Sequence, residues 1–199
     1  MQDRFFFLLS AAVAGAFVVI ALQPWAERPP RGPVSAGGRN AEDITIAGEE
    51  LHRFVPGDYE AIAIVTPPEG GDPVLRITLM KDEIYDAPRS GPHIVLDSDL
   101  EYAFEARPVR VEMVARASGD FGARQFEADY YARPEAESGW KPFDLTPEWR
   151  TYSFDYDVPR ILDDAGYDYV GIRPVAPDKR SVMELRSLRI RAMGPKKTD

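Results

Sequence analysis

The chain has 199 residues, a net charge of −9 and no cysteine. The acidic balance disfavours nucleic-acid binding, because phosphates require a basic surface, and it also disfavours broad adhesion to anionic lipid. Without cysteine, the protein has no disulfides, no thiolate nucleophile and no cysteine metal ligands.

The first element, after a short tail at residues 1–4, is an unbroken apolar run from Phe5 to Leu22. As a helix this run would span about 27 Å, close to the ~30 Å hydrocarbon core of a bilayer. A cleaved signal peptide needs small residues before the cleavage site. Cleavage after Ala26 would place Pro24 at the −3 position, and the other candidate site ends in Gln23. We therefore expect an uncleaved transmembrane anchor.

The basic residues around this run conflict with its layout. Arg4 precedes the run, whereas Arg28, Arg31 and Arg39 follow it, so the positive-inside rule favours a cytoplasmic C-terminal domain. A short N-terminal tail before one apolar segment is instead typical of an exported, anchored domain. We expect the second arrangement: a single-pass membrane protein of the cell envelope with a periplasmic domain.

Residues 23–42 are rich in proline and glycine and predict a linker. We expect one domain over residues 43–193 and a flexible tail over 194–199. Within the domain, apolar and polar residues alternate with period two, which is typical of half-buried strands. The expected strands are Ile44–Ile46, Tyr59–Val65, Leu75–Met80, His93–Leu96, Tyr102–Ala106, Val109–Arg116, Gln125–Tyr131, Arg150–Tyr156, Tyr169–Arg173 and Leu188–Arg191. The one helical candidate, a weak one, is Pro159–Ala165. Short strands separated by turn residues predict an antiparallel sandwich or barrel.

The stretch from Val109 to Ile190 carries a resemblance in strand order and aromatic placement. A turn containing Trp140 is followed by F-D-L-T-P-E-W at Phe143–Trp149, and the closing strands lie at Tyr169–Pro174 and Met183–Ile190. This pattern resembles the jelly-roll modules of the galactose-binding-like fold, which include many carbohydrate-binding modules. The resemblance implies an all-β, antiparallel jelly-roll sandwich whose last strand pairs with its first. Such folds host binders, structural modules and enzyme accessory domains alike.

Exposed aromatic residues would suit a sugar binder, because pyranose rings offer apolar C–H faces to Trp and Tyr. The candidates are Trp140, Trp149, Tyr130, Tyr131 and Tyr85. Trp140 is the best of them, because it follows Ser138-Gly139 in an expected loop, although it could equally cap the core. The side chains at Tyr152, Phe154 and Tyr156 share one strand face and are expected in the core.

Four arginines, Arg116, Arg124, Arg133 and Arg173, could donate to sugar hydroxyls or to a carboxylate through the forked guanidinium. The alternative is a solvated strand face with cross-strand ion pairs. The ligand-binding set that we expect is Trp140, Tyr130, Tyr131, Arg133 and Arg116.

No metal or cofactor is assigned from the sequence. The acidic pairs Asp97/Asp99, Asp155/Asp157 and Asp163/Asp164 could supply oxygens to a structural calcium of the kind that the resembled modules often hold, but no EF-hand spacing is present. The two histidines, His52 and His93, lie in neither G-x-S-x-G nor H-E-x-x-H contexts. We therefore expect no catalytic residues.

Three functions remain open at this point. The first is a membrane-anchored, non-catalytic envelope module that binds a carbohydrate or similar polymer. The second is a protein–protein interaction or scaffold module of an envelope complex. The third is a small hydrolase or lyase, which would require a deep cleft that holds His52 or His93 beside carboxylates.

Overall fold

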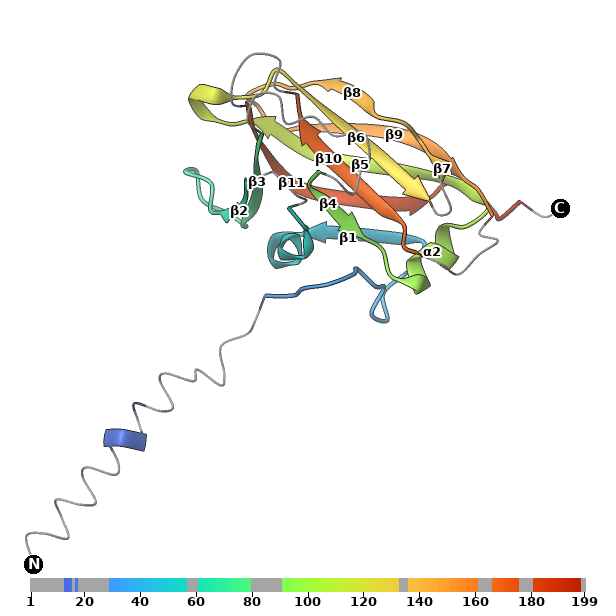
Figure 1. The fold of residues 1–199 in the computed structure, drawn as a ribbon, viewed down its shortest axis with the longest axis horizontal. Coiled ribbons are helices and arrows are strands. Elements are labelled where there is room, and N and C mark those ends of the chain that lie inside the picture. The colour runs from blue at the N-terminus through green and yellow to red at the C-terminus, as the bar shows by residue number, and fades with distance from the viewer. Residues whose placement is uncertain are drawn as a thin grey trace, which may run out of the picture.

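The structure is a computed structural model that describes residues 13–15, 17, 29–56, 61–79, 91–132, 136–160, 166–175 and 181–197. Its strands form two antiparallel sheets that face each other across a common core (Figure 1). The expected all-β, antiparallel sandwich is confirmed.

The larger sheet has six strands in the order β2-β3-β11-β5-β9, and β1 also pairs with β11. The strands are β1 (Asp43–Ala47), β2 (Ala61–Val65), β3 (Val74–Leu79), β5 (Arg107–Ala117), β9 (Arg150–Val158) and β11 (Ser181–Ala192). The first strand pairs with the last from Asp43↔Arg191 to Ala47↔Ser187, as the resemblance implied. On the same side of β11, β3 pairs with residues 181–185, and the register with β5 shifts between Leu185 and Ser187.

The smaller sheet has five strands in the order β4-β10-β6-β7, with β8 also paired to β6. The strands are β4 (His93–Val95), β6 (Gln125–Ala132), β7 (Ala136–Glu137), β8 (Lys141–Asp144) and β10 (Tyr169–Pro174). The two-residue strand β7 and the short strand β8 were not among the expected elements.

The core lies between the sheets because alternate residues of each strand point inward. From the larger sheet, Val109, Val111 and Met113 of β5 are fully buried. Across from them, Phe126 of β6 stacks on Phe143 with ring centroids 5.0 Å apart. The inward residues of β9, namely Tyr152, Phe154 and Tyr156, pack against this core as expected.

One expected strand is wrong: Tyr102–Ala106 overlaps a helix, α2, which spans Ser98–Phe104. The side chain of Asp97 accepts a hydrogen bond from the Ser98 N–H and caps the helix. Leu100, Ala103 and Phe104 are buried, and their spacing of three and four residues is helical. Two 3₁₀ helices, η1 (Gly48–Arg53) and η3 (Gly119–Phe121), complete the described helical elements of the domain. Of the helical candidate Pro159–Ala165, residues 161–165 lie outside the described residues.

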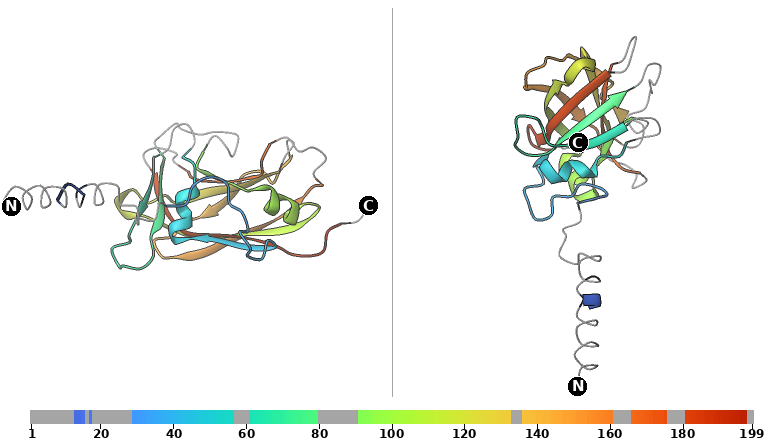
Figure 2. Two further views of the ribbon diagram at one scale, coloured as in Figure 1. Left: turned by 90° about the horizontal axis from the view of Figure 1, so that it is seen from below. Right: turned by 90° about the vertical axis from the view of Figure 1, so that its left-hand side faces the viewer.

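The last part of the expected linker contacts the folded domain. Val34 is fully buried, and its backbone N–H donates to the Val95 carbonyl at 2.8 Å. The Arg53 guanidinium of η1 donates to the carbonyls of residues 31, 32 and 33 at 3.2, 3.4 and 2.9 Å, so this segment lies beside η1 (Figure 2). Val34 therefore supplies a core side chain from within the segment expected as linker.

The expected tail at 194–199 is also partly ordered onto the domain. The Lys197 N–H donates to the Ala106 carbonyl at 2.6 Å, and the Lys196 ammonium lies 3.6 Å from the ring centroid of Tyr102. These contacts hold residues 196 and 197 against the end of α2.

Within the described part of the chain, no helix is both long enough and apolar enough to cross a bilayer. Apart from residues 13–15 and 17, the expected anchor Phe5–Leu22 falls outside the described residues.

Candidate functional site

The outward side of the smaller sheet gathers aromatic and charged side chains from three neighbouring strands. Alternation along β6 turns Phe126, Ala128 and Tyr130 into the core, so Glu127, Asp129 and Tyr131 point outward. The register between β6 and β10 sets Tyr131 beside Tyr169, Asp129 beside Gly171 and Glu127 beside Arg173, and it sets His93 of β4 on the other side of Gly171. We call this surface the β10 face; it comprises His93, Glu127, Asp129, Tyr131, Tyr169, Gly171 and Arg173, with Trp140 from the loop before β8.

An aromatic row crosses the β10 face. The rings of Tyr131 and Tyr169 lie 6.1 Å apart between centroids, and His93 meets Tyr169 edge-on at 5.4 Å. The Nδ1 atom of His93 lies 2.7 Å from the Gly91 carbonyl, which fixes the imidazole plane. Both tyrosines are half-buried, so each ring is supported by the protein and still reaches the surface. Such rings suit the apolar face of a ligand.

Arg173 is held between Trp140 and Glu127. Its guanidinium carbon lies 3.9 Å from the Trp140 ring centroid, a cation–π contact. Its Nε and Nη2 atoms donate to Glu127 Oε2 at 3.0 and 2.9 Å. Gly139, with φ at +71°, turns the chain just before Trp140 in a conformation that favours glycine. Arg173 therefore covers one face of Trp140 and fixes the position of the indole.

Two buried polar atoms on the β10 face lack a hydrogen-bond partner among the described residues. Asp129 is fully buried, and its Oδ1 accepts from the Ser138 hydroxyl at 2.8 Å, whereas its Oδ2 has no partner. Arg173 is 7% exposed, and its Nη1 also has none. Burial raises the pKa of Asp129, the Ser138 hydrogen bond opposes this, and the charge of Glu137 raises the pKa further. A buried polar atom without a partner costs about 1–3 kcal/mol, so these two atoms mark a place where a ligand could supply hydrogen bonds.

The outward side of the larger sheet differs because its charges pair with one another. Arg116 donates to Glu184 Oε2 at 2.8 Å and to Glu69 Oε1 at 2.6 Å, and its guanidinium lies 4.4 Å from the Trp149 ring centroid. Elsewhere on this side, Arg189 pairs with Asp43 and Arg110 pairs with Asp155. This is the alternative that the sequence left open for Arg116, a strand face with cross-strand ion pairs.

The structure separates the expected ligand-binding set. Trp140 and Tyr131 lie on the β10 face, whereas Arg116 lies on the other sheet. Tyr130 is not an exposed aromatic: its side chain is fully buried, and its hydroxyl donates to Asp168 Oδ2 at 2.9 Å. Arg133 lies outside the described residues, as does the further candidate Tyr85.

Tyr169 and Asp129 belong to the β10 face but were not singled out from the sequence. Asp129 could have been found, because Glu127 and Asp129 alternate with Phe126 and Ala128 and so mark one side of β6. Its lack of a partner for Oδ2 depends on the tertiary structure and leaves no signal in the sequence.

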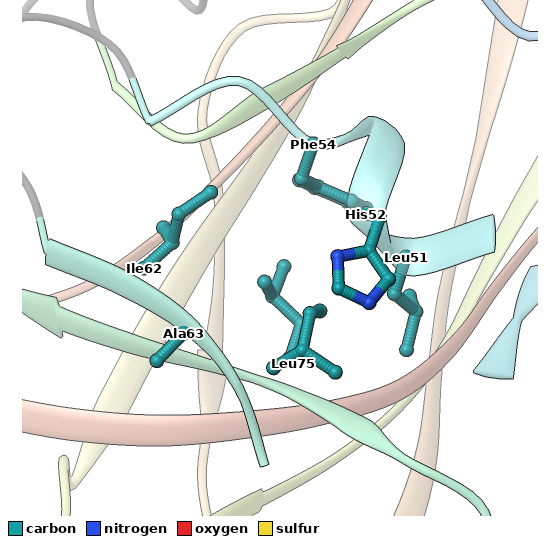
Figure 3. A pocket seen from close by; sticks show the side chains of 7 residues that line it. Leu51, His52, Phe54, Ile62, Ala63 and Leu75 are labelled. Carbon is teal, nitrogen blue, oxygen red and sulfur yellow. The ribbon is translucent and has the colours of Figure 1, made fainter. Parts of the chain in front are cut away.

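The two histidines belong to different elements: His93 lies on β4 in the β10 face, whereas His52 lies on η1. His52 of η1 lines an apolar hollow of about 250 Å³ beside β2, whose other lining residues are Leu51, Phe54, Ile62, Ala63, Ile64 and Leu75 (Figure 3). The carboxylate paired with His52 is that of Glu49 on the same 3₁₀ helix, at 3.4 Å. The hollow is therefore an aliphatic and aromatic recess with one imidazole, and its lining contains no carboxylate from the described residues.

The described acidic pairs have structural partners. Asp97 caps α2, and Asp99 accepts from the Ala36 N–H at 2.8 Å. Asp155 pairs with Arg110, and Asp157 pairs with Lys197 at 3.0 Å. Among the described residues, no group of three or more histidine, cysteine or acidic side chains is arranged to hold a metal ion. Asp163 and Asp164 lie outside the described residues.

Comparison with solved structures finds carbohydrate-binding modules. The CBM22-2 xylan-binding domain of Paenibacillus barcinonensis Xyn10C superposes with a TM-score of 0.55 at 9% sequence identity, over 75% of this chain and 99% of that domain. The CBM22-1 xylan-binding domain of the same protein gives a TM-score of 0.53 at 9% identity, over 78% of this chain and 95% of that domain. No protein-family profile and no curated protein sequence matches the chain. At this level of identity the likeness establishes the fold: the domain is a jelly-roll sandwich of the type found in carbohydrate-binding modules.

Proposed function

We propose that this protein is a non-catalytic module that binds a carbohydrate or a similar polyhydroxylated polymer on the β10 face. One observation carries the proposal. The Tyr131–Tyr169–His93 row and the unpartnered atoms Asp129 Oδ2 and Arg173 Nη1 lie on the same side of the smaller sheet. The likeness to two xylan-binding domains supports the proposal through the fold.

A sugar ring matches both parts of this arrangement. Its axial C–H groups present an apolar face that can lie on the tyrosine rings, and its rim carries hydroxyls that both donate and accept hydrogen bonds. A hydroxyl can donate to Asp129 Oδ2 and another can accept from Arg173 Nη1, which would relieve two unmet hydrogen-bonding requirements. Apolar surfaces with a few placed polar groups are typical of small-molecule sites.

The proposal extends to the place where the module works. The apolar run Phe5–Leu22 has the length of a membrane span and lacks a good cleavage site, which supports a membrane-tethered protein with the domain on the periplasmic side. Protease treatment of spheroplasts tests this: the domain should be digested in intact spheroplasts. Digestion only after lysis would place the domain in the cytoplasm and would exclude an envelope glycan as its ligand.

The test of glycan binding uses the full-length chain, purified in nonionic detergent, on a glycan array and in pull-downs with insoluble xylan, cellulose and mannan. We expect binding to at least one neutral polysaccharide. Removing an aromatic ring in Tyr131→Ala or Trp140→Ala should weaken that binding about tenfold, equivalent to ~1.4 kcal/mol.

The matched control is Tyr102→Ala, which removes an exposed tyrosine on α2 whose ring contacts Lys196 and is not part of the β10 face. Thermal unfolding of each variant separates loss of binding from loss of the fold. If Tyr131→Ala and Trp140→Ala bind as tightly as Tyr102→Ala, the β10 face is not the glycan site. If no glycan is retained by the wild-type chain, the function is not carbohydrate binding, and crosslinking in native membranes becomes the test of a scaffold role.

A further inference from the structure

Among the described residues, the charges on the outward side of the smaller sheet are predominantly negative. The register and alternation of the smaller sheet place four carboxylates on its outward side among the described residues, those of Glu127, Asp129, Glu137 and Asp144. Arg173, a described guanidinium on this side, already donates to Glu127. Lys141 of β8 lies close enough to Asp129 to lower the pKa of that carboxyl, and it supplies the second nearby cation. The described residues on this side therefore present more negative than positive charge to a ligand.

The unpartnered atoms add a chemical requirement to this charge. Asp129 Oδ2 is an acceptor, so its partner must donate a hydrogen bond. A hydroxyl can donate to Asp129 and can also accept from Arg173 Nη1, whereas a carboxylate or a sulfate can only accept. Because Asp129 is fully buried, water screens its charge poorly, and an anionic group placed beside it is repelled.

We propose that the β10 face selects uncharged, hydroxyl-rich glycans and rejects glycans that carry carboxylate or sulfate groups. This selectivity rests on the proposed glycan-binding function and adds the class of glycan to it. The groups that produce it are Asp129, through its acceptor atom and charge, and Glu137, through its charge alone. Glu137 lies beside Tyr131 in the sheet register and is exposed to solvent.

The selectivity is tested with polymers that share a backbone and differ in charge. The probes are hydroxyethyl cellulose against carboxymethyl cellulose, and carboxyl-reduced against native glucuronoxylan, each titrated by affinity electrophoresis or calorimetry with the full-length chain in nonionic detergent. We expect the uncharged member of a pair to bind at least tenfold more tightly than the charged member at low salt. Equal or tighter binding of the charged member overturns the selectivity but leaves glycan binding intact. Retention of no polymer from either pair or from the array contradicts the proposed function, and the selectivity falls with it.

Charge-removing variants identify the residues responsible. Glu137→Gln keeps the side-chain size at an exposed position, and it should raise affinity for the charged polymer two- to threefold with little change for the uncharged one. Asp129→Asn should raise affinity for the charged polymer further, because the added amide can donate to an anion. Asp155→Asn, which removes a carboxylate from the other sheet, is the matched control and should change neither affinity. If the two face variants behave like Asp155→Asn, the face charges do not set the selectivity.

Salt supplies a second readout that does not depend on mutation. Raising the salt concentration to about 0.5 M shortens the range of electrostatic repulsion to roughly 4 Å. Binding of the charged polymer to the wild-type chain should then strengthen, and the effect should shrink in Glu137→Gln. Weaker binding of the charged polymer at high salt would mean that attraction rather than repulsion governs its encounter, and would overturn the proposal.

Discussion

Tyr130 and Tyr131 are adjacent in sequence and have opposite roles. Tyr131 lies on the β10 face, and Tyr130 fills the core, where its ring lies 5.5 Å from that of Tyr156. The two aromatics look alike as sugar-stacking candidates until the alternation that begins at Phe126 is followed to the end of β6. A single residue of register therefore decides which tyrosine can meet a ligand.

Removing the Tyr130 hydroxyl should destabilise the fold. Tyr130→Phe deletes the buried hydrogen bond to Asp168 Oδ2 and leaves that carboxylate with one donor fewer. We expect the free energy of unfolding to fall by about 1–3 kcal/mol, as measured by urea denaturation. Tyr131→Phe is the control and should change stability by no more than about 0.5 kcal/mol. Equal stability of the two variants would show that the Tyr130 hydroxyl contributes nothing.

Two arginines, Arg116 and Arg173, look alike in the sequence but have different surroundings in the structure. Arg116 and Arg173 both lie on outward strand positions, and both stack on a tryptophan, Trp149 and Trp140 respectively. They differ in how their buried N–H groups are satisfied. Arg116 donates to two carboxylates, whereas Arg173 retains a buried Nη1 without a partner among the described residues. This difference depends on which strands pair with one another, and that pairing cannot be inferred from the sequence.

At the scale of elements, most strands follow from the sequence pattern, whereas α2 lies where the pattern was interpreted as a strand. Strands such as β5 and β9 alternate over many residues, whereas Tyr102–Ala106 offers only a few apolar positions compatible with either period. The helical signal was nevertheless present in the Asp97 cap and in the spacing of Leu100, Ala103 and Phe104. The short strands β7 and β8 both form by pairing with β6, so their own sequences carry little strand signal.

The junction of β3, β11 and β5 encloses one carboxylate that several donors share. The Glu184 side chain is 1% exposed and accepts hydrogen bonds from Arg76, Arg116 and Ser118. Burial alone would raise the pKa of Glu184, but these hydrogen bonds outweigh it and the pKa is lowered. The ionised form therefore stabilises the fold above the ordinary glutamate pKa of 4.5, and this stabilisation is lost as the pH falls through the lowered value.

Glu184→Gln should reveal this contribution through its pH dependence. At pH 7 we expect the free energy of unfolding to fall by about 2 kcal/mol, less than for a fully buried pair because both arginines are partly solvated. The gap between variant and wild type should narrow below pH 4.5, because the wild-type carboxyl becomes neutral. Asp155→Asn, at an exposed ion pair, should cost at most about 1 kcal/mol. A gap for Glu184→Gln that stays constant from pH 7 to pH 3 would contradict this account.

At the scale of the molecule, strand spacing and turn residues predicted the sandwich, and the resemblance predicted that its ends would pair. β1 and β11 are separated by more than a hundred residues, yet they pair over five positions. Pairing at such separation leaves no local pattern, so composition and periodicity could not have supplied it. The same reason explains why the proline-rich segment predicts a linker: its few apolar residues show no periodicity, and only the fold provides the site that buries Val34 and Ala36.

Truncations test whether that segment is part of the domain. A chain that begins at residue 29 should retain its stability, whereas one that begins at residue 39 loses the buried Val34 side chain and the carbonyls that Arg53 binds. We expect the shorter chain to lose about 2–4 kcal/mol in urea denaturation, from apolar burial and hydrogen bonds together. Identical unfolding midpoints for the two chains would mean that residues 29–38 are linker and not part of the folded domain.

The attachment of residues 31–33 to Arg53 also limits how far the domain can reach from a membrane. If Phe5–Leu22 spans a bilayer, only the eight residues 23–30 remain to separate the domain from its anchor. Fully extended, they measure at most about 28 Å. A polymer bound by such a module would be held within this tether length plus the width of the domain from the lipid surface, so the protein would sample the layer of envelope next to the membrane and leave more distant layers out of range.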